Sequence, residues 1–100
     1  MDQTEKNPDP TQEAVDLTSF DLDLLLGLFV SVLSAKAWQY MGIRLAPGKE
    51  EMEKDLVKAA TAIDCVSFLV DRLAPNMSES DAGRLKAMVS DLQINYAKWA

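Results

Sequence analysis

The sequence predicts an all-α domain of three helices that associates into an oligomer. The segment Leu22–Met41 has fourteen apolar residues in twenty, and they lie around the whole circumference of a helix. Two later segments repeat their apolar residues at alternating spacings of three and four, which is the period of an amphipathic helix. No segment alternates apolar and polar residues as a strand does.

The bulk composition indicates one small domain. The chain has 100 residues, 48% of them apolar, and a net charge of −6. An acidic chain without a cluster of Lys and Arg does not favour nucleic acid or an anionic membrane surface as a partner. Cys65 is the only cysteine, so an intrachain disulfide is impossible and a reducing cytoplasm fits best.

Residues 1–17 are expected to form a flexible acidic tail, followed by a single three-helix domain over residues 18–100. Pro8 and Pro10 stand among polar residues in this tail. Its acidic residues outnumber its one base, Lys6: they are Asp2, Glu5, Asp9, Glu13 and Asp16. This composition is the opposite of a secretory signal peptide.

The first helix is expected to begin near Thr18-Ser19 and to end near Met41. Thr18-Ser19 offers a capping hydroxyl, and Asp21 and Asp23 suit the positive N-terminus of a helix. Gly42 is a typical residue just past a helix end, and Pro47-Gly48 follows it.

The second helix is expected from about Lys49 to Leu73. Glu50 and Lys54 form an i,i+4 pair in the favourable order. A seam of apolar residues recurs at spacings of four and three: Met52, Leu56, Ala59, Ile63, Val66, Val70 and Leu73. Such a heptad pattern predicts packing against a neighbouring helix at about +20°.

The third helix is expected from about Glu79 to Lys98. Pro75 interrupts the preceding helix, and Ser78 with Asp81 resembles a capping box. Its seam consists of Leu85, Val89, Leu92, Tyr96 and Trp99. We expect the second and third helices to form an antiparallel hairpin through an Ala74–Met77 turn, with the first helix packed across them.

The first helix has more apolar surface than two neighbours can cover. A helix that is apolar on every side must be buried on every side, so part of it should be an interface. Gly27, Ser31 and Ala35 form a ridge of small residues that either meets a second copy or accepts the second helix internally. The candidate interface residues are Leu22, Leu25, Gly27, Phe29, Ser31, Val32, Ala35 and Trp38 on this helix, with Val57, Cys65 and Phe68 on the next.

A membrane partner is not expected. The uncharged stretch, residues 24–35, spans only about 18 Å as a helix, against about 30 Å for a bilayer core. Asp23 and Lys36 bracket it, although Lys36 could extend to a membrane surface. The seams of the two later helices also require an apolar partner, which this helix provides.

No arrangement of residues predicts catalysis, so we expect no enzyme activity and no catalytic, cofactor-binding or metal-binding residues. The chain has no histidine, the usual general base and the commonest ligand of transition metals. Asp64 and Asp71 share one side of the second helix, where they are expected to be solvated or paired with Arg72 or Arg84. Cys65 is expected to be a small buried apolar residue, since no histidine can activate it.

From Leu24 to Tyr96 the chain resembles a bacterial family, domain of unknown function 1844. The resemblance rests on three stretches: the apolar helix ending in Met41-Gly42, the residues Asp55-Leu56…Ala59…Ile63-Asp64, and Asn76-Met77-Ser78-Glu79 leading to Leu92 and Tyr96. It implies a small helical protein of the bacterial cytoplasm, and no activity or catalytic residue comes with it.

The sequence therefore predicts a non-enzymatic structural or interaction module that self-associates, most simply as a homodimer. An alternative is an adaptor that binds a helix of another protein through the apolar face of the first helix. A weaker alternative is attachment of that helix to a membrane.

Overall fold

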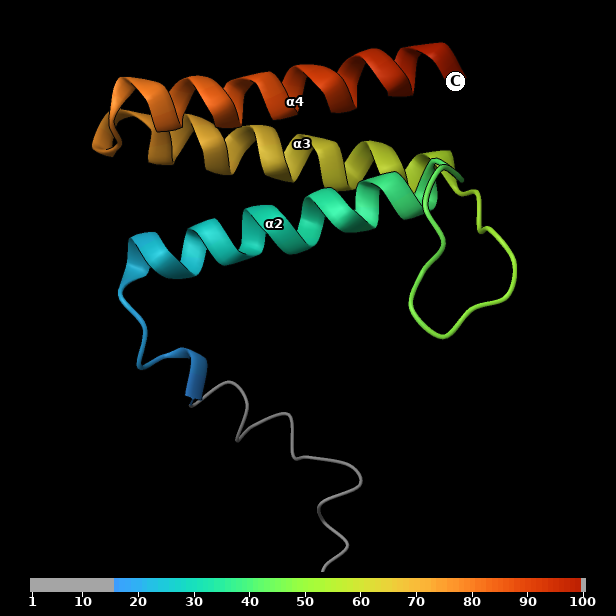
Figure 1. Ribbon diagram of the computed structural model, residues 1–100, viewed down its shortest axis with the longest axis horizontal. Helices are drawn as coiled ribbons and strands as arrows, with labels where there is room; N and C mark the ends of the chain where they lie inside the picture. The colour runs from blue at the N-terminus through green and yellow to red at the C-terminus, as the bar shows by residue number, and fades with distance from the viewer. Residues whose placement is uncertain (1–15, 100) are drawn as a thin grey trace, which may run out of the picture.

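The computed structural model describes residues 16–99, and these form three long helices and no strand (Figure 1). The helices are α2 (Leu22–Tyr40), α3 (Leu56–Leu73) and α4 (Glu79–Trp99), with a short 3₁₀ turn, η2 (Ala74–Asn76), between the last two. Successive helices run in opposite directions, and α3 contacts both of the others (Figure 1). The all-α, three-helix prediction is confirmed for the described part of the chain.

Helix α2 begins at Leu22 and not near Thr18-Ser19. Asp21 is the capping residue, and its carboxylate accepts a hydrogen bond of 3.3 Å from the Asp23 N–H. Asp16 and Leu17, which fall within the predicted tail, lie in a helical turn that precedes this cap. The rest of the predicted tail lies outside the described residues.

The end of α2 agrees with the prediction. Met41 caps the helix, and its N–H donates to the Ala37 carbonyl. Gly42 follows with φ +78°, a left-handed conformation that residues with a Cβ rarely adopt. Met41 is buried and forms an isolated antiparallel bridge with Lys54.

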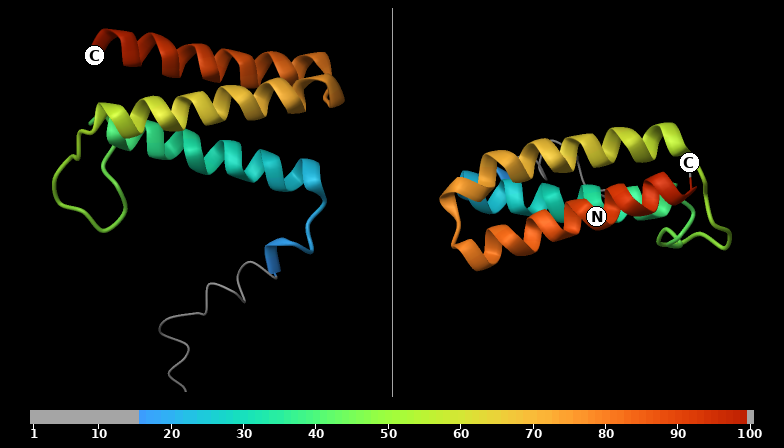
Figure 2. Two further views of the ribbon diagram at one scale, coloured as in Figure 1. Left: turned by 180° about the vertical axis from the view of Figure 1, so that it is seen from behind. Right: turned by 90° about the horizontal axis from the view of Figure 1, so that it is seen from above.

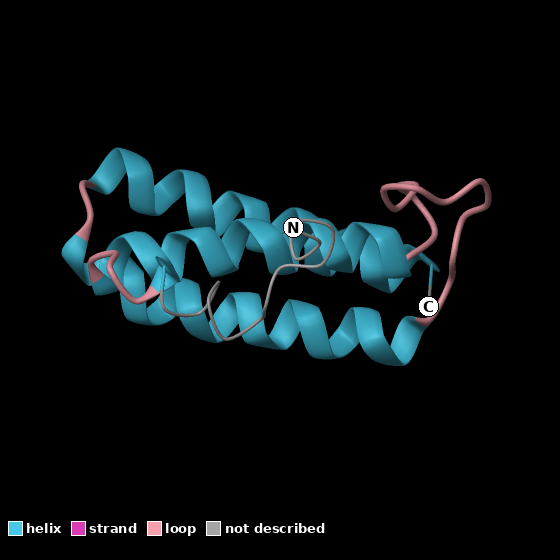
Figure 3. Cartoon of the chain, turned by 90° about the horizontal axis from the view of Figure 1, so that it is seen from below, coloured by secondary structure: helices cyan, strands magenta, loops and turns pink. Residues whose placement is uncertain are grey.

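Helix α3 begins seven residues later than predicted. Asp55 is its capping residue, and the Asp55 carboxylate accepts a hydrogen bond of 3.1 Å from the Lys58 N–H. Residues 42–55 form an irregular loop instead (Figure 3). Met52 is 55% exposed in this loop and takes no part in the seam, and the expected Glu50–Lys54 helical pair does not exist.

The rest of the predicted seam of α3 forms the centre of the core. Its buried members are Ala59, Ile63, Val66, Val70 and Leu73, joined by Ala62. They pack with Val30 and Ala37 from α2, with Met41 that caps it, and with Val89 and Leu92 from α4. Because alanines lie on the contact side of α3, the helix axes can approach closely.

The strongest packing in the fold joins α2 to α3, while α2 and α4 scarcely touch. The sequence predicted an α3–α4 hairpin as the main unit with α2 laid across it. The hairpin exists, and the chain reverses through η2, but α3 shares its larger interface with α2 (Figure 2). Helix α2 is therefore an integral part of the core along one side.

The start of α4 is as predicted. The Ser78 hydroxyl accepts a hydrogen bond of 3.1 Å from the Asp81 N–H, which satisfies a free donor at the helix N-terminus. Met77, just before this cap, packs against the core. Trp99 departs from the predicted seam: it is 52% exposed, with the Lys54 ammonium 5.8 Å from its ring centroid.

Candidate interaction surface

One side of α2 stays uncovered in the folded chain. We define the outer face of α2 as the apolar residues Leu22, Leu24, Leu25, Leu28, Phe29 and Val32. Five of them are exposed, at 65% for Leu22, 57% for Leu24, 38% for Leu28, 40% for Phe29 and 55% for Val32, and Leu25 is half-buried. The core side of the same helix, at Val30 and Ala37, is almost completely buried.

Sequence reasoning found four of these six residues and missed Leu24 and Leu28. The sequence did contain a signal for these two residues. Leu24, Leu28 and Val32 are spaced by four residues, so they are neighbours on one surface of a helix. Predicted Trp38 belongs elsewhere: it is partly buried and packs against the core. Its backbone carbonyl accepts hydrogen bonds from the Ile43 and Arg44 N–H groups.

The ridge of small residues does not hold α3. A Cβ added at Gly27 would have no atom within 4 Å, Ser31 is exposed and Ala35 is half-buried. The alternative in which this ridge accepts the second helix internally is therefore wrong. The neighbouring small residue Ser34 faces inward instead: it is buried, with its hydroxyl oxygen 3.7 Å from the Met88 sulfur of α4.

A second apolar area lies along the seam between α2 and α3. A shallow groove of about 370 Å³ is lined by Leu33 of α2 and by Asp64, Cys65, Phe68 and Leu69 of α3. The lining is almost entirely apolar. Leu33 follows Phe29 by one helical turn, so this groove continues the outer face of α2 toward α3.

Of the three candidate interface residues predicted on α3, Cys65 and Phe68 line this groove and Val57 does not. Phe68 is 62% exposed and lies on its rim, with the Arg72 guanidinium 5.9 Å from its ring centroid. Cys65 was expected to be buried, but its place on the side of α3 away from the core leaves it exposed. Val57 is 78% exposed near the other end of α3 and does not line the groove.

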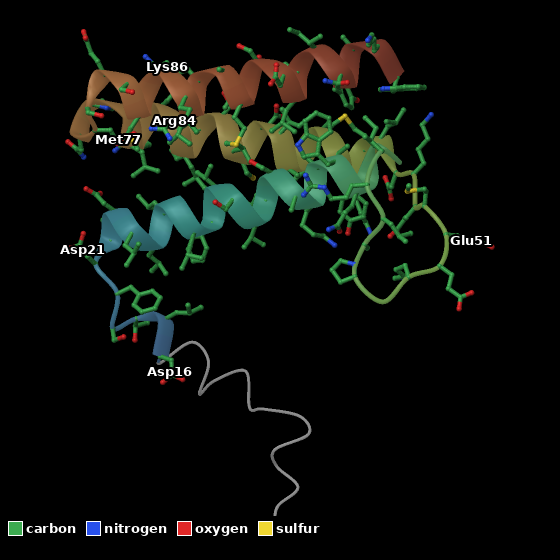
Figure 4. The ribbon with its side chains drawn as sticks, viewed as in Figure 1. Asp16, Asp21, Glu51, Met77, Arg84 and Lys86 are labelled. Carbon is green, nitrogen blue, oxygen red and sulfur yellow. The ribbon has the colours of Figure 1, made fainter. Side chains whose placement is uncertain are left out.

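The two ends of α2 carry opposite charges. Asp21 and Asp23 are exposed at its start, where Figure 4 shows Asp21. At its end, the ammonium groups of Lys36 and Lys58 lie 4.7 Å and 5.5 Å from the centroid of the Tyr40 ring. Within residues 16–99 the ion pair is Arg84–Asp81, so no described carboxylate lies within 4.0 Å of either lysine.

The two carboxylates considered for chemistry, Asp64 and Asp71, line separate hollows of the surface. Asp64 and Asp71 are both exposed, and Arg84 pairs with Asp81 of its own helix and not with Asp71. In the described part of the chain, no three Cys, Asp or Glu side chains are grouped closely enough to hold a metal ion. Figure 4 shows Arg84, Lys86 and Met77 together at the turn end of the hairpin, and Asp71 lines a hollow there together with Met77 and Lys86.

Helix α2 is long and apolar enough to cross a membrane, judged by length and composition alone. Core helices of soluble proteins and N-terminal signal sequences also meet this criterion. Only 22% of the stretch is buried in the structure, whereas a core helix is mostly buried. The apolar surface of α2 thus exceeds what α3 and α4 cover.

Comparison with known proteins identifies the family alone. No curated protein and no solved structure matches the chain significantly. The model of one family, described as domain of unknown function (DUF1844), matches residues 23–98, which include all but the first residue of α2, all of α3 and all of α4 except Trp99. The chain belongs to the DUF1844 family.

Proposed function

We propose that this protein is a non-enzymatic structural or interaction module that self-associates through the outer face of α2. The observation that carries the proposal is the row of five large apolar side chains exposed there. Each Å² of apolar surface removed from water contributes about 25 cal/mol. Contiguous apolar patches of more than a few hundred Å² are rare on soluble monomers and mark interaction sites.

The non-enzymatic part of the proposal rests on the side chains that the chain offers. It has no histidine, and its one cysteine lies on the rim of an apolar groove. Asp64 and Asp71 are exposed to solvent and, within the described residues, belong to no group of three Cys, Asp or Glu side chains that could hold a metal ion. General acid–base chemistry needs positioned groups within hydrogen-bonding reach of a reactant, and the described surface offers an apolar face instead.

Light scattering after gel filtration tests self-association with matched variants. Leu25→Glu and Phe29→Glu place a charge on the outer face, and Ile94→Glu places one at a 60% exposed apolar position on α4. We expect the first two to reduce the apparent mass toward that of one chain, 11.1 kDa, while Ile94→Glu keeps the mass of the unmodified protein. Equal masses for all three variants and the unmodified chain would reject the outer face as the interface.

An adaptor that binds a helix of another protein is the second candidate. The groove beside Leu33, Cys65 and Phe68 favours it, because amphipathic helices bind in apolar grooves. Phe68→Glu should then abolish capture of a protein partner while the chain still self-associates. If Phe68→Glu removes only the homo-oligomer, the adaptor candidate fails.

Attachment to a membrane is a third candidate, and the length and composition of α2 favour it. Its net charge of −6 opposes binding to anionic lipids. We propose a cytoplasmic location because the only cysteine is a free thiol, which suits a reducing compartment. Flotation with anionic and neutral vesicles distinguishes a membrane-attached protein from one that stays in solution. Recovery of the protein wholly in the vesicle-free fraction without detergent would exclude the membrane candidate.

A further inference from the structure

The charges at the two ends of α2 determine how a second copy can approach. The start of α2 carries the exposed carboxylates of Asp21 and Asp23. Its end carries the ammonium groups of Lys36 and Lys58, which have no described carboxylate within 4.0 Å. Between them lies the uncharged, apolar outer face.

From this arrangement we infer that α2 pairs with α2 of a second copy in the antiparallel orientation. Resting on the proposed self-association, this inference specifies its geometry. Antiparallel pairing brings the acidic start of each helix to the basic end of the other. Parallel pairing would place Asp21 against Asp21 and Lys36 against Lys36, and like charges in an interface disfavour that arrangement.

The register follows from the position of the charges. Asp21 and Lys36 are fifteen residues apart, about 22 Å along the helix axis. When Asp21 of one copy lies opposite Lys36 of the other, Leu25 lies opposite Val32 and Leu28 lies opposite Phe29. All these pairs belong to the outer face or border it, and a two-fold axis passes between Leu28 and Phe29.

Lys58 extends the complementarity beyond α2. It belongs to α3, yet its ammonium group lies over the same Tyr40 ring as that of Lys36. Two positive charges are therefore held around one aromatic ring at the end of α2. In the antiparallel pair, Asp21 and Asp23 of the second copy approach this end and meet these two positive charges.

Disulfide cross-linking tests the orientation. The background is Cys65→Ser, because the native thiol is exposed. Leu25→Cys and Val32→Cys are made on separate chains, one carrying a size tag. A disulfide requires Cα atoms within about 7 Å, whereas two Leu25 positions would be offset by about 10 Å along the axis of an antiparallel pair.

The expected result is a rapid disulfide between Leu25→Cys and Val32→Cys chains and none within either variant alone. Ile94→Cys on α4 is the control for random collisions. Rapid self-cross-linking of Leu25→Cys alone would show a parallel pair and overturn the inference. A dimeric mass without the Leu25–Val32 disulfide would also overturn it, although self-association would stand.

Charge reversal provides a second test of the orientation, in chains that keep the native Cys65. Lys36→Glu should weaken the dimer several-fold, because the new carboxylate then faces the acidic start of the second copy. Adding Asp21→Asn to the same chain should restore part of the affinity, since asparagine can still cap α2 but no longer repels the new carboxylate. If the double variant dimerises no more tightly than Lys36→Glu alone, the antiparallel orientation is wrong. A monomeric mass for the unmodified protein at every concentration would reject the proposed self-association as well.

Discussion

The backbone carbonyl of Tyr40, the last residue of α2, accepts a hydrogen bond of 2.8 Å from the N–H of Asp55, which caps α3. The Asp55 carboxylate in turn accepts from the Lys58 N–H at 3.1 Å. One residue thus connects the end of α2 to the start of α3. The Met41–Lys54 bridge lies directly beside it.

Replacing Asp55 by Ala should therefore destabilise the fold by about 1 kcal/mol, the usual loss for a helix cap. The free energy of unfolding in urea, followed by circular dichroism, measures it. Asp71→Ala is the matched control, since this exposed carboxylate on the same helix caps nothing. Equal stability of the two variants would contradict the capping role.

The core at Leu92 predicts a larger effect. Leu92 is completely buried between the helices, so Leu92→Ala should lower the free energy of unfolding by about 2–5 kcal/mol. Ile94→Ala, two residues along the same helix at 60% exposure, should stay within about 0.5 kcal/mol of the unmodified protein. Similar losses at both positions in thermal or urea unfolding would contradict the described packing of α4.

The ridge residue Gly27 predicts a gain in stability. A methyl group at this position meets no atom within 4 Å, so Gly27→Ala should stabilise α2 by about 0.5–1 kcal/mol. Gly27 lies about 160° around the helix from Leu25 and from Phe29, so a methyl group there should leave the contacts of these two residues with a second copy unchanged.

Gly48→Ala provides the contrast for that prediction. Gly48 also has free space around it, but its φ of +78° is left-handed. Alanine there should cost about 1–2 kcal/mol of stability. If Gly27→Ala weakens the dimer in light scattering, the interface extends from the outer face onto the ridge of small residues beside Leu24 and Leu28.

Local signals in the sequence predicted the helices better than their starting points. Ser78 before α4 and Gly42 after α2 act through bonds and dihedral angles of their own neighbourhood, and both were predicted correctly. The start of α3 depends on the bond from Asp55 to Tyr40, which joins segments distant in sequence. The spacing of Met52 fitted the heptad pattern but contained no information about that bond.

The sequence predicted that α2 has an uncovered apolar face, but it did not predict on which side of the helix that face lies. Excess apolar residues on Leu22–Met41 indicated that an uncovered face should exist, and the structure shows which side it is. Periodicity could not tell which side of α2 would face α3, so the predicted interface included Trp38, which packs against the core. The exposure of Cys65 depends in the same way on how α3 is rotated against its neighbours.

Sedimentation equilibrium of the unmodified protein at several micromolar concentrations tests the central claim most directly. If the outer face of α2 binds a second copy, the mass should rise with concentration from 11.1 kDa toward twice that value, and Phe29→Glu should remove the rise. A well-folded monomer at every concentration, with the same mass as Phe29→Glu, would contradict the account.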